Sequence, residues 1–123
     1  MDMRNRTDEI ALWQMYIHAG TQAIGESPDA DGVTIIRTVK GTEYRFPYYM
    51  DKNYVPEILA ALRAAGDVHV RHLVHIWKNH WLDVPSYSLR QALLALHPQN
   101  ADAHLMLIGE ENFVFLSVRD TML

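Results

Sequence analysis

A β-branched run followed by a turn and an aromatic run constrains the fold of this chain more than any other feature. Residues 33–39 are rich in Val, Ile and Thr, Lys40 and Gly41 supply a turn, and residues 42–49 return as a second run. Pro47 cannot donate a hydrogen bond within a sheet, so the second strand is expected to lie at an edge or to end there. The pattern therefore predicts an antiparallel β-hairpin.

The aromatic residues of the second strand allow two interpretations. Tyr44, Phe46 and Tyr48 occupy alternate positions and so share one face of the strand. Aromatic residues are common in strands, which favours a sheet face packed beneath helices. With Arg45 and Tyr49, the same residues would instead form a stacking platform for bases or a peptide. Tyr44 is for this reason a candidate ligand or interface residue.

An amphipathic helix is expected before the hairpin, over residues 7–24. Thr7 is a suitable N-cap, and the acidic pair that follows it complements the helix dipole. Apolar residues recur along one stripe at helical spacing. Leu12 and Met15 lie off this stripe, which indicates that a second side of the helix is covered, either by another helix of the chain or by a second subunit.

The middle of the chain predicts three consecutive helices joined by short connections. The first covers residues 55–65 and stops at Gly66, and the second covers residues 67–79 with Asp67 as its cap. The third follows Pro85, and in it Ser88 and Gln91 have the spacing of a capping box. Short connections imply that these helices pack as neighbours.

The end of the chain predicts a second hairpin, from LMLI at residues 105–108 and FVFLSV at residues 113–118. A competing interpretation makes residues 101–108 a helix capped by Asn100. The expected fold class is α+β, with an antiparallel sheet of two β-hairpins packed against an N-terminal helix and a central three-helix segment. We expect residues 1–123 to form one globular domain.

Two short stretches resemble helical repeats. ALRAAGDVHVRHLV, at residues 61–74, resembles the turn of a HEAT repeat, and ALLALHPQNADAHLMLIG, at residues 92–109, resembles the junction between tetratricopeptide repeats. Neither recurs at its repeat period, and a solenoid needs about three repeats to bury its core. The resemblances imply helix-turn-helix packing and place the whole chain in no named family.

Composition removes several classes of function. The net charge is −4, from 15 acidic and 11 basic residues, which makes a nucleic-acid partner unlikely on electrostatic grounds and argues against anionic membranes. The absence of cysteine excludes disulfides, thiolate metal sites and cysteine nucleophiles. The N-terminus lacks a signal peptide, and no stretch is long enough to span a membrane. We expect a soluble cytoplasmic protein.

Residues 69–81 are unusually rich in histidine, with four of the seven histidines of the chain. Taken as part of a helix, Val70, Leu73, Val74 and Trp77 form a buried stripe, and the two central histidines lie on the exposed side. These histidines, His72 and His75, are therefore candidates for a ligand or an interface. Trp81 follows the helix and is a candidate binding hot spot where its indole is exposed.

A metal site would need three or four converging ligands, and this helix supplies two imidazoles. A third would have to come from His97, His104 or Asp83, while Arg71 and Lys78 would repel a cation. We therefore predict no metal ligands and no cofactor.

No catalytic signature is present in the sequence, which contains no G-x-S-x-G elbow, phosphate-binding loop or dinucleotide fingerprint. The first hypothesis is a small non-catalytic binding or protein-interaction module that self-associates or binds another protein. The second is a DNA-binding regulator, since three helices followed by a hairpin have the order of a winged helix. The third is a small-ligand-binding protein or enzyme with a histidine-lined pocket between helices and sheet. Candidate polar groups for that pocket are His18, Arg37, Glu43, Tyr44, His72, His75 and His104.

Overall fold

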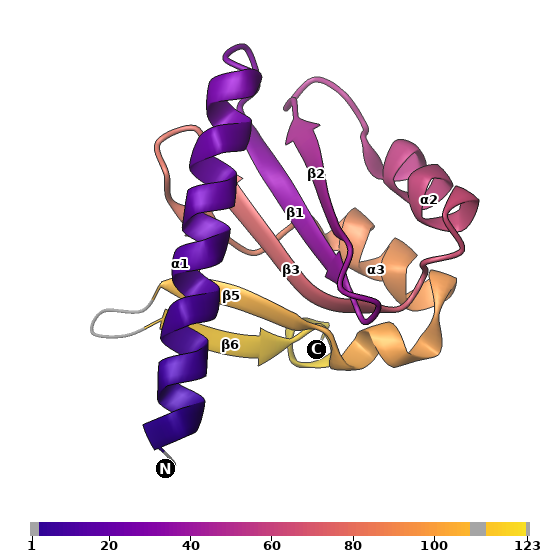
Figure 1. Ribbon diagram of the computed structural model, residues 1–123. Helices are drawn as coiled ribbons and strands as arrows, with labels where there is room; N and C mark the ends of the chain where they lie inside the picture. Colours follow the sequence, from indigo (N-terminus) through magenta and orange to yellow (C-terminus); the bar gives the residue numbers. More distant parts are fainter. Residues whose placement is uncertain (1–2, 109–112, 123) are drawn as a thin grey trace.

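The computed structural model describes residues 3–108 and 113–122, which form a six-stranded sheet with helices on both faces (Figure 1). In chain order the elements are α1 (Met3–Glu26), β1 (Gly32–Thr38), β2 (Glu43–Tyr48), α2 (Val55–Ala64), β3 (Val70–Trp77), β4 (Leu82–Asp83), α3 (Tyr87–Leu96), the 3-10 helix η1 (Pro98–Asp102), β5 (His104–Ile108), β6 (Phe113–Ser117) and the 3-10 helix η2 (Arg119–Thr121). The α+β class is therefore confirmed.

The strands are ordered β2-β1-β3-β5-β6, and the short β4 pairs with β3. All pairings are antiparallel except that of β3 with β5, which is parallel. A parallel pair needs a crossover connection, and here α3 and η1 lie between the two strands. β3 lies in the centre of the sheet. Helices cover both of its faces, and a neighbouring strand lies on each side of it.

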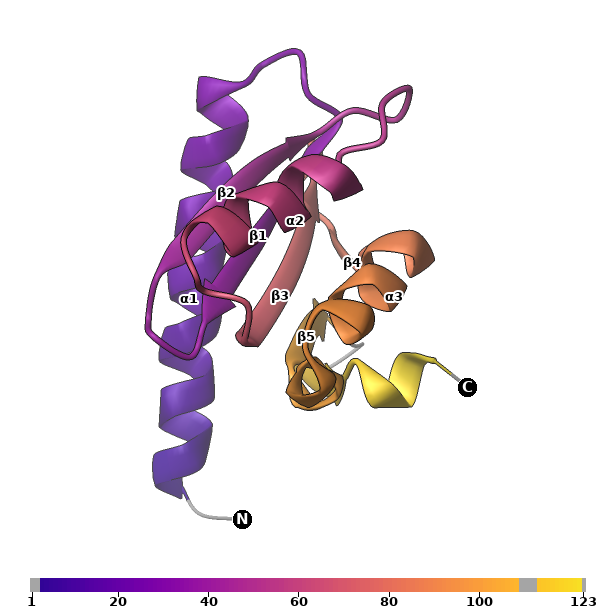
Figure 2. The same cartoon turned by 90° about the vertical axis from the view of Figure 1, so that its right-hand side faces the viewer.

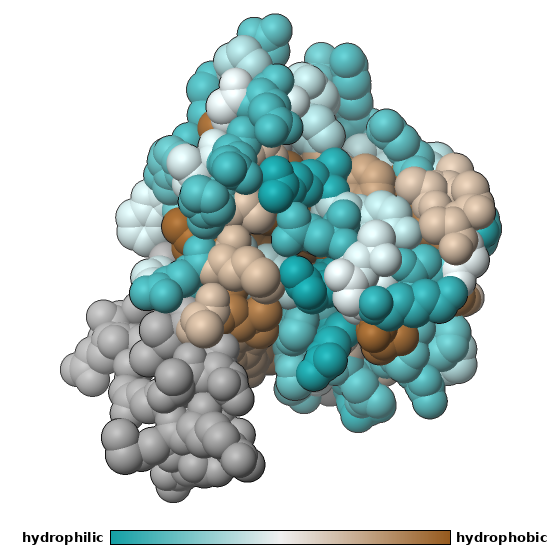
Figure 3. All heavy atoms as spheres, viewed as in Figure 1, coloured by the Kyte–Doolittle hydropathy of each residue, from teal (hydrophilic) through white to brown (hydrophobic). Residues whose placement is uncertain are grey.

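Two apolar cores form, one on each face of the sheet. Helix α1 crosses one face, whereas α2 and α3 cover the other (Figures 1 and 2). The core under α1 contains Tyr16, Ala19, Ala23, Val33, Ile35, Val74, Ile76, Leu82 and Met106. The core under α2 and α3 contains Ile36, Tyr54, Ile58, Leu62, Val70, Leu73, Leu89, Leu93, Ala103, Leu105 and Val118. The outer surface on the α1 side is mostly hydrophilic, with hydrophobic side chains in small, separate areas (Figure 3).

Helix α1 was expected over residues 7–24 and is longer, because it already begins at Met3. Thr7 therefore lies inside the helix and is not its N-cap. Leu12 is half-buried against the core under α1, whereas Met15 remains 37% exposed. No described helix combines the length and the apolar character that a membrane span requires.

Both predicted hairpins form, as the pairs β1–β2 and β5–β6. β2 is an edge strand, as Pro47 indicated, and Gly41 in the first turn has a φ of +90°. Tyr44, Phe46 and Tyr48 pack against the core under α2 and α3, which confirms the favoured interpretation of that face. The helix considered for residues 101–108 is wrong, since Asn100 lies within η1 and β5 follows it.

The predicted helix over residues 67–79 is wrong, because residues 70–77 form β3. A sheet of two hairpins alone is also wrong, since β3 separates them and leaves two helices, not three, in the middle of the chain. The physical reason is double burial. A strand covered on both faces has apolar residues at adjacent positions, and Val70, Leu73, Val74 and Trp77 happen to match helical spacing.

The helices on either side of β3 form where expected, but two of the predicted caps are wrong. Gly66, with a φ of +63°, follows the end of α2 as its predicted stop. Asp67 caps no helix; its carboxylate accepts a hydrogen bond from the Thr38 hydroxyl at 2.7 Å. The capping box predicted from Ser88 and Gln91 is wrong, because the N-cap of α3 is Ser86, whose side chain accepts from the backbone N–H of Leu89.

Candidate functional site

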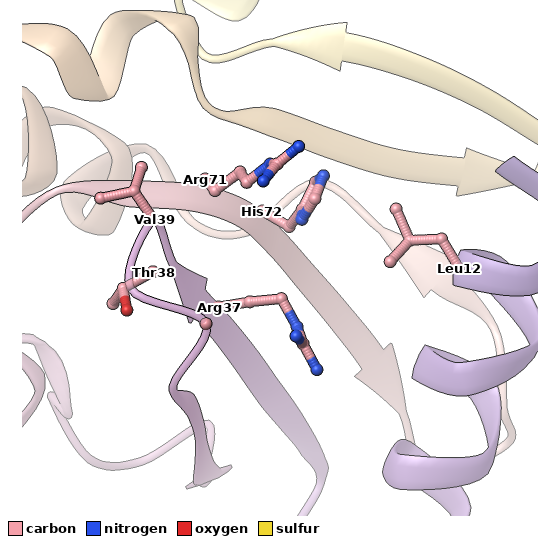
Figure 4. Close-up of a pocket in the computed structure, with 7 residues that line it drawn as sticks. Leu12, Arg37, Thr38, Val39, Arg71 and His72 are labelled. Atoms are coloured by element: carbon pink, nitrogen blue, oxygen red, sulfur yellow. The ribbon is translucent and has the colours of Figure 1, made fainter. Parts of the chain in front are cut away.

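The candidate site is a pocket of about 330 Å³ between α1 and the adjoining ends of β1 and β3. Figure 4 shows Arg37 on β1, and Arg71 and His72 on β3, around this pocket. Leu12 points toward them from α1. The other lining residues are Thr38, Val39 and Gly41. Two strand ends thus place two guanidinium groups and an imidazole around one space, which α1 closes with Leu12.

A β-bulge explains why two consecutive residues of β3 reach the pocket. Arg37 pairs with His72, but the next residue of β1, Thr38, pairs with Val70. Arg71 is therefore an extra residue that has no partner in the β1 register. The bulge allows Arg71 and His72 to line the same pocket, although neighbouring residues of a regular strand point to opposite faces.

Positive charge exceeds negative charge around the pocket. Arg37 lies 4.0 Å from Glu43, but the same carboxylate accepts a 2.9 Å hydrogen bond from Arg45. Glu43 thus offsets one of two neighbouring guanidinium groups. Among the side chains of residues 11–107 and 114–122, no ion pair forms on Arg71.

Three buried polar atoms beside the pocket have no hydrogen-bond partner among the described residues. They are the Tyr16 hydroxyl, Nε of Arg37 and Nδ1 of His72. The ring centroids of Tyr16 and His72 are 5.8 Å apart, in an edge-to-face arrangement. Burial raises the pKa of Tyr16 far above its ordinary value, and the nearby Arg37 opposes this only in part. Tyr16 is therefore a neutral phenol at neutral pH.

His72 is also neutral at neutral pH. Burial is the main cause, followed by the charges of Arg71, His104 and Arg37, and together they lower the pKa of His72 to about 4. A neutral imidazole has one N–H donor and one acceptor nitrogen. The ring can thus either donate to or accept from a ligand in the pocket.

His75 does not lie on an exposed face as expected; it is 3% exposed. Its Nδ1 is 2.9 Å from the Thr34 hydroxyl oxygen, which is 2.7 Å from the Tyr54 hydroxyl. The rings of Tyr48 and Trp77 meet the imidazole edge-on. Burial lowers the pKa of His75 to about 4, against an opposing contribution from Asp83. This histidine is enclosed by the fold and lines none of the pocket around Arg37.

The remaining candidates lie elsewhere. Tyr44 stacks on Phe46 and donates a 3.1 Å hydrogen bond to Asp67, so it belongs to the far face of the sheet. Trp81 is 64% exposed in the turn before β4. Of the candidates from the sequence, Arg37 and His72 line this pocket, while Glu43 lies beside Arg37 and His104 beside His72. Arg71 is a site residue that the sequence did not indicate, because a bulge leaves no recognisable pattern in a single sequence.

The histidines do not assemble a metal centre among the described residues, where no three His, Asp or Glu side chains are close enough to hold an ion. His69 stacks on His97 with ring centroids 4.7 Å apart. His72 and His104 lie next to each other on β3 and β5, with centroids 6.3 Å apart. A smaller hollow of about 260 Å³, lined in part by Arg71, His72 and His104, continues the pocket toward these rings.

Comparison with known proteins assigns no family: no family model matches the chain, and no curated protein is significantly similar to it. Inference of function therefore depends on the chemistry of the pocket. That chemistry is cationic and hydrogen-bonding, with apolar contact from Leu12 and Val39.

Proposed function

We propose that this protein is a small non-catalytic binding module whose ligand occupies the pocket between α1, β1 and β3. The observation that supports this is the convergence of Arg37, Arg71 and His72 on one open space between α1, β1 and β3, next to buried polar atoms that lack a hydrogen-bond partner among the described residues. An unsatisfied buried polar group costs about 1–3 kcal/mol, and native proteins contain few of them. The exposed guanidinium of Arg71 is the group that a ligand in this space would contact first.

The hydrogen bonds of the residues that line the pocket favour binding over catalysis. The one hydroxyl among the described lining residues, that of Thr38, already donates to the Asp67 carboxylate at 2.7 Å. No described carboxylate orients Nδ1 of His72, so the described part of the pocket lacks the base–orienter pair of a nucleophilic enzyme. The polar groups are instead suited to hold a ligand.

A fragment titration followed by ¹H–¹⁵N NMR tests this proposal. We expect small polar compounds to shift the backbone amides of Gly41, Arg71 and His72 together and saturably. Val39→Trp fills the pocket from an exposed position and should abolish the shifts. The matched control Val114→Trp, at an exposed position of β6, should preserve them. A broad fragment set that shifts no pocket residue would contradict the proposal.

Self-association is a second candidate function, and the length of α1 favours it. The N-terminal turns of this helix extend past β6, beyond the sheet that the rest of the helix covers (Figures 1 and 2). Met15 is exposed on the same helix. A second copy packed along α1 would cover this surface and form a homodimer.

Sedimentation velocity over a wide range of protein concentration tests self-association. We expect a dimer that Met15→Glu weakens, because the substitution places a charge in the proposed interface. Gln14→Glu makes the same charge change at a neighbouring exposed position and serves as the control. A monomer at every concentration would rule this candidate out.

A further inference from the structure

We propose that the pocket recognises a small organic molecule through a phosphate group. This inference rests on the proposed binding function and adds the chemical class of the ligand.

The charge around the pocket matches a dianion better than a monoanion. Arg37 and Arg71 are the charged residues among the described residues that line the pocket, and Glu43 beside Arg37 is balanced by Arg45. Two positive charges therefore remain to be balanced. A phosphate monoester carries about −1.5 to −2 at neutral pH, whereas a carboxylate carries a single charge.

The donor groups suit tetrahedral oxygens. A guanidinium presents several N–H groups in a planar fork that matches phosphate, and its charge-assisted hydrogen bonds are about twice as strong as neutral ones. Arg37 lines the pocket, and its side chain is 27% exposed. The neutral imidazole of His72 lines the same space and has one N–H donor. Arg71 completes the set from the bulge.

The pocket is larger than a phosphate ion needs. At about 330 Å³ it lies at the lower end of the range for small-molecule sites. Leu12 and Val39 supply apolar contacts beside the charged groups. The ligand is therefore expected to have a short apolar or aromatic part attached to its phosphate.

Three compounds with the same ring separate the possible outcomes: phenyl phosphate, benzoate and benzyl alcohol. Each is titrated into ¹⁵N-labelled protein at constant ionic strength, with the backbone amides and the Arg Nε–H signals as probes. We expect phenyl phosphate to bind about tenfold more tightly than benzoate, because it makes more charge-assisted hydrogen bonds. Benzyl alcohol should bind most weakly.

Two charge-matched variants test the site. Arg71→Met should weaken phenyl phosphate binding about tenfold through loss of one charge-assisted contact. Arg63→Met removes the same charge from an exposed position on α2 and should leave binding unchanged. Both positions are exposed, and unchanged spectra outside the pocket confirm that each variant is folded.

The outcomes distinguish failure of this inference from failure of the binding function. If benzoate or benzyl alcohol binds in the pocket as tightly as phenyl phosphate, the pocket binds ligands but phosphate recognition is wrong. Equal weakening by Arg71→Met and Arg63→Met would also overturn it, since binding would then follow net charge alone. If no compound, in this set or a broad fragment set, shifts Gly41, Arg71 and His72, both proposals fail.

Discussion

Thr34 and His75 share a buried hydrogen bond, with 2.9 Å between the hydroxyl oxygen and Nδ1, although they are 41 residues apart in the chain. The bond joins β1 to β3 on the face covered by α2 and α3. Because the imidazole is enclosed, its protonation is linked to the stability of the whole fold.

The fold should lose stability as the pH falls. The pKa of His75 is about 4 in the folded protein and 6.5 in an unfolded chain, so the unfolded state binds more protons below pH 6.5. Stability is therefore complete above pH 6.5, falls toward pH 4, and is lower by about 3 kcal/mol once both states are protonated. Urea denaturation followed by tryptophan fluorescence at several pH values measures this.

The variant His75→Gln should be less stable at pH 7 but should lose less stability on acidification. His72 also has a pKa of about 4, so part of the pH dependence should remain. His18→Gln, at an exposed position of α1, is the control and should retain the full dependence. An unchanged pH slope in His75→Gln would show that the buried imidazole is not its source.

Asn100 should be among the least replaceable polar residues. Its fully buried side chain accepts a hydrogen bond from the Val70 N–H at 2.7 Å and donates to the carbonyl oxygens of Val68 and Leu93. Asn100→Asp loses both donated bonds and buries a charge, so we expect a loss of about 3 kcal/mol. Gln99→Glu makes the same change at the exposed neighbour and should have little effect. Equal melting temperatures for the two variants would contradict this role.

Two glycines should respond in opposite directions to alanine. A Cβ at Gly32 would lie 2.7 Å from the backbone oxygen of Ile76 and 3.2 Å from Cα of Trp77, so β1 and β3 would have to separate. We expect Gly32→Ala to cost about 1–3 kcal/mol. Gly25, in α1, has open space around it, and Gly25→Ala should stabilise by up to about 1 kcal/mol. Thermal denaturation distinguishes the two results, and a neutral Gly32→Ala would refute the close approach.

Two buried tyrosines should also differ when their hydroxyls are removed. Tyr54→Phe loses the bond to Thr34 and should cost about 1 kcal/mol. Tyr16→Phe removes a hydroxyl that has no hydrogen-bond partner among the described residues, so stability should stay constant or rise by about 1 kcal/mol. Chemical denaturation compares the variants, and a large loss for Tyr16→Phe would mean that its hydroxyl is already satisfied.

Most of the fold could be predicted from local signals. The β-branched run, the Lys40-Gly41 turn and the aromatic alternation define the first hairpin, and Gly66 marks the end of α2. β3 could not be recognised, because a central strand buried on both faces loses the alternation that identifies strands. Its β-branched content, at Val70, Val74 and Ile76, was the signal that favoured a strand.

Only part of the site was predictable. Arg37 and His72 were candidates on chemical grounds, but their meeting depends on the pairing of β1 with β3, which long-range contacts determine. Whether the side chain of His75 is buried also depended on β3, since a helix would have exposed this side chain whereas the sheet buries it. Side-chain chemistry was therefore readable from the sequence, and side-chain location was not.

In a central strand, a residue usually cannot change in size or charge without disturbing the packing of the cores. The bulge at Arg71 removes this constraint. The regularly paired residues of β3 pack into the two cores, so replacing them disturbs the packing. Arg71 lies outside that pairing and is exposed, and its side chain can change size or charge while the register is kept. Related chains could for this reason diversify what the pocket accepts at this one position, at little cost to the stability of the sheet.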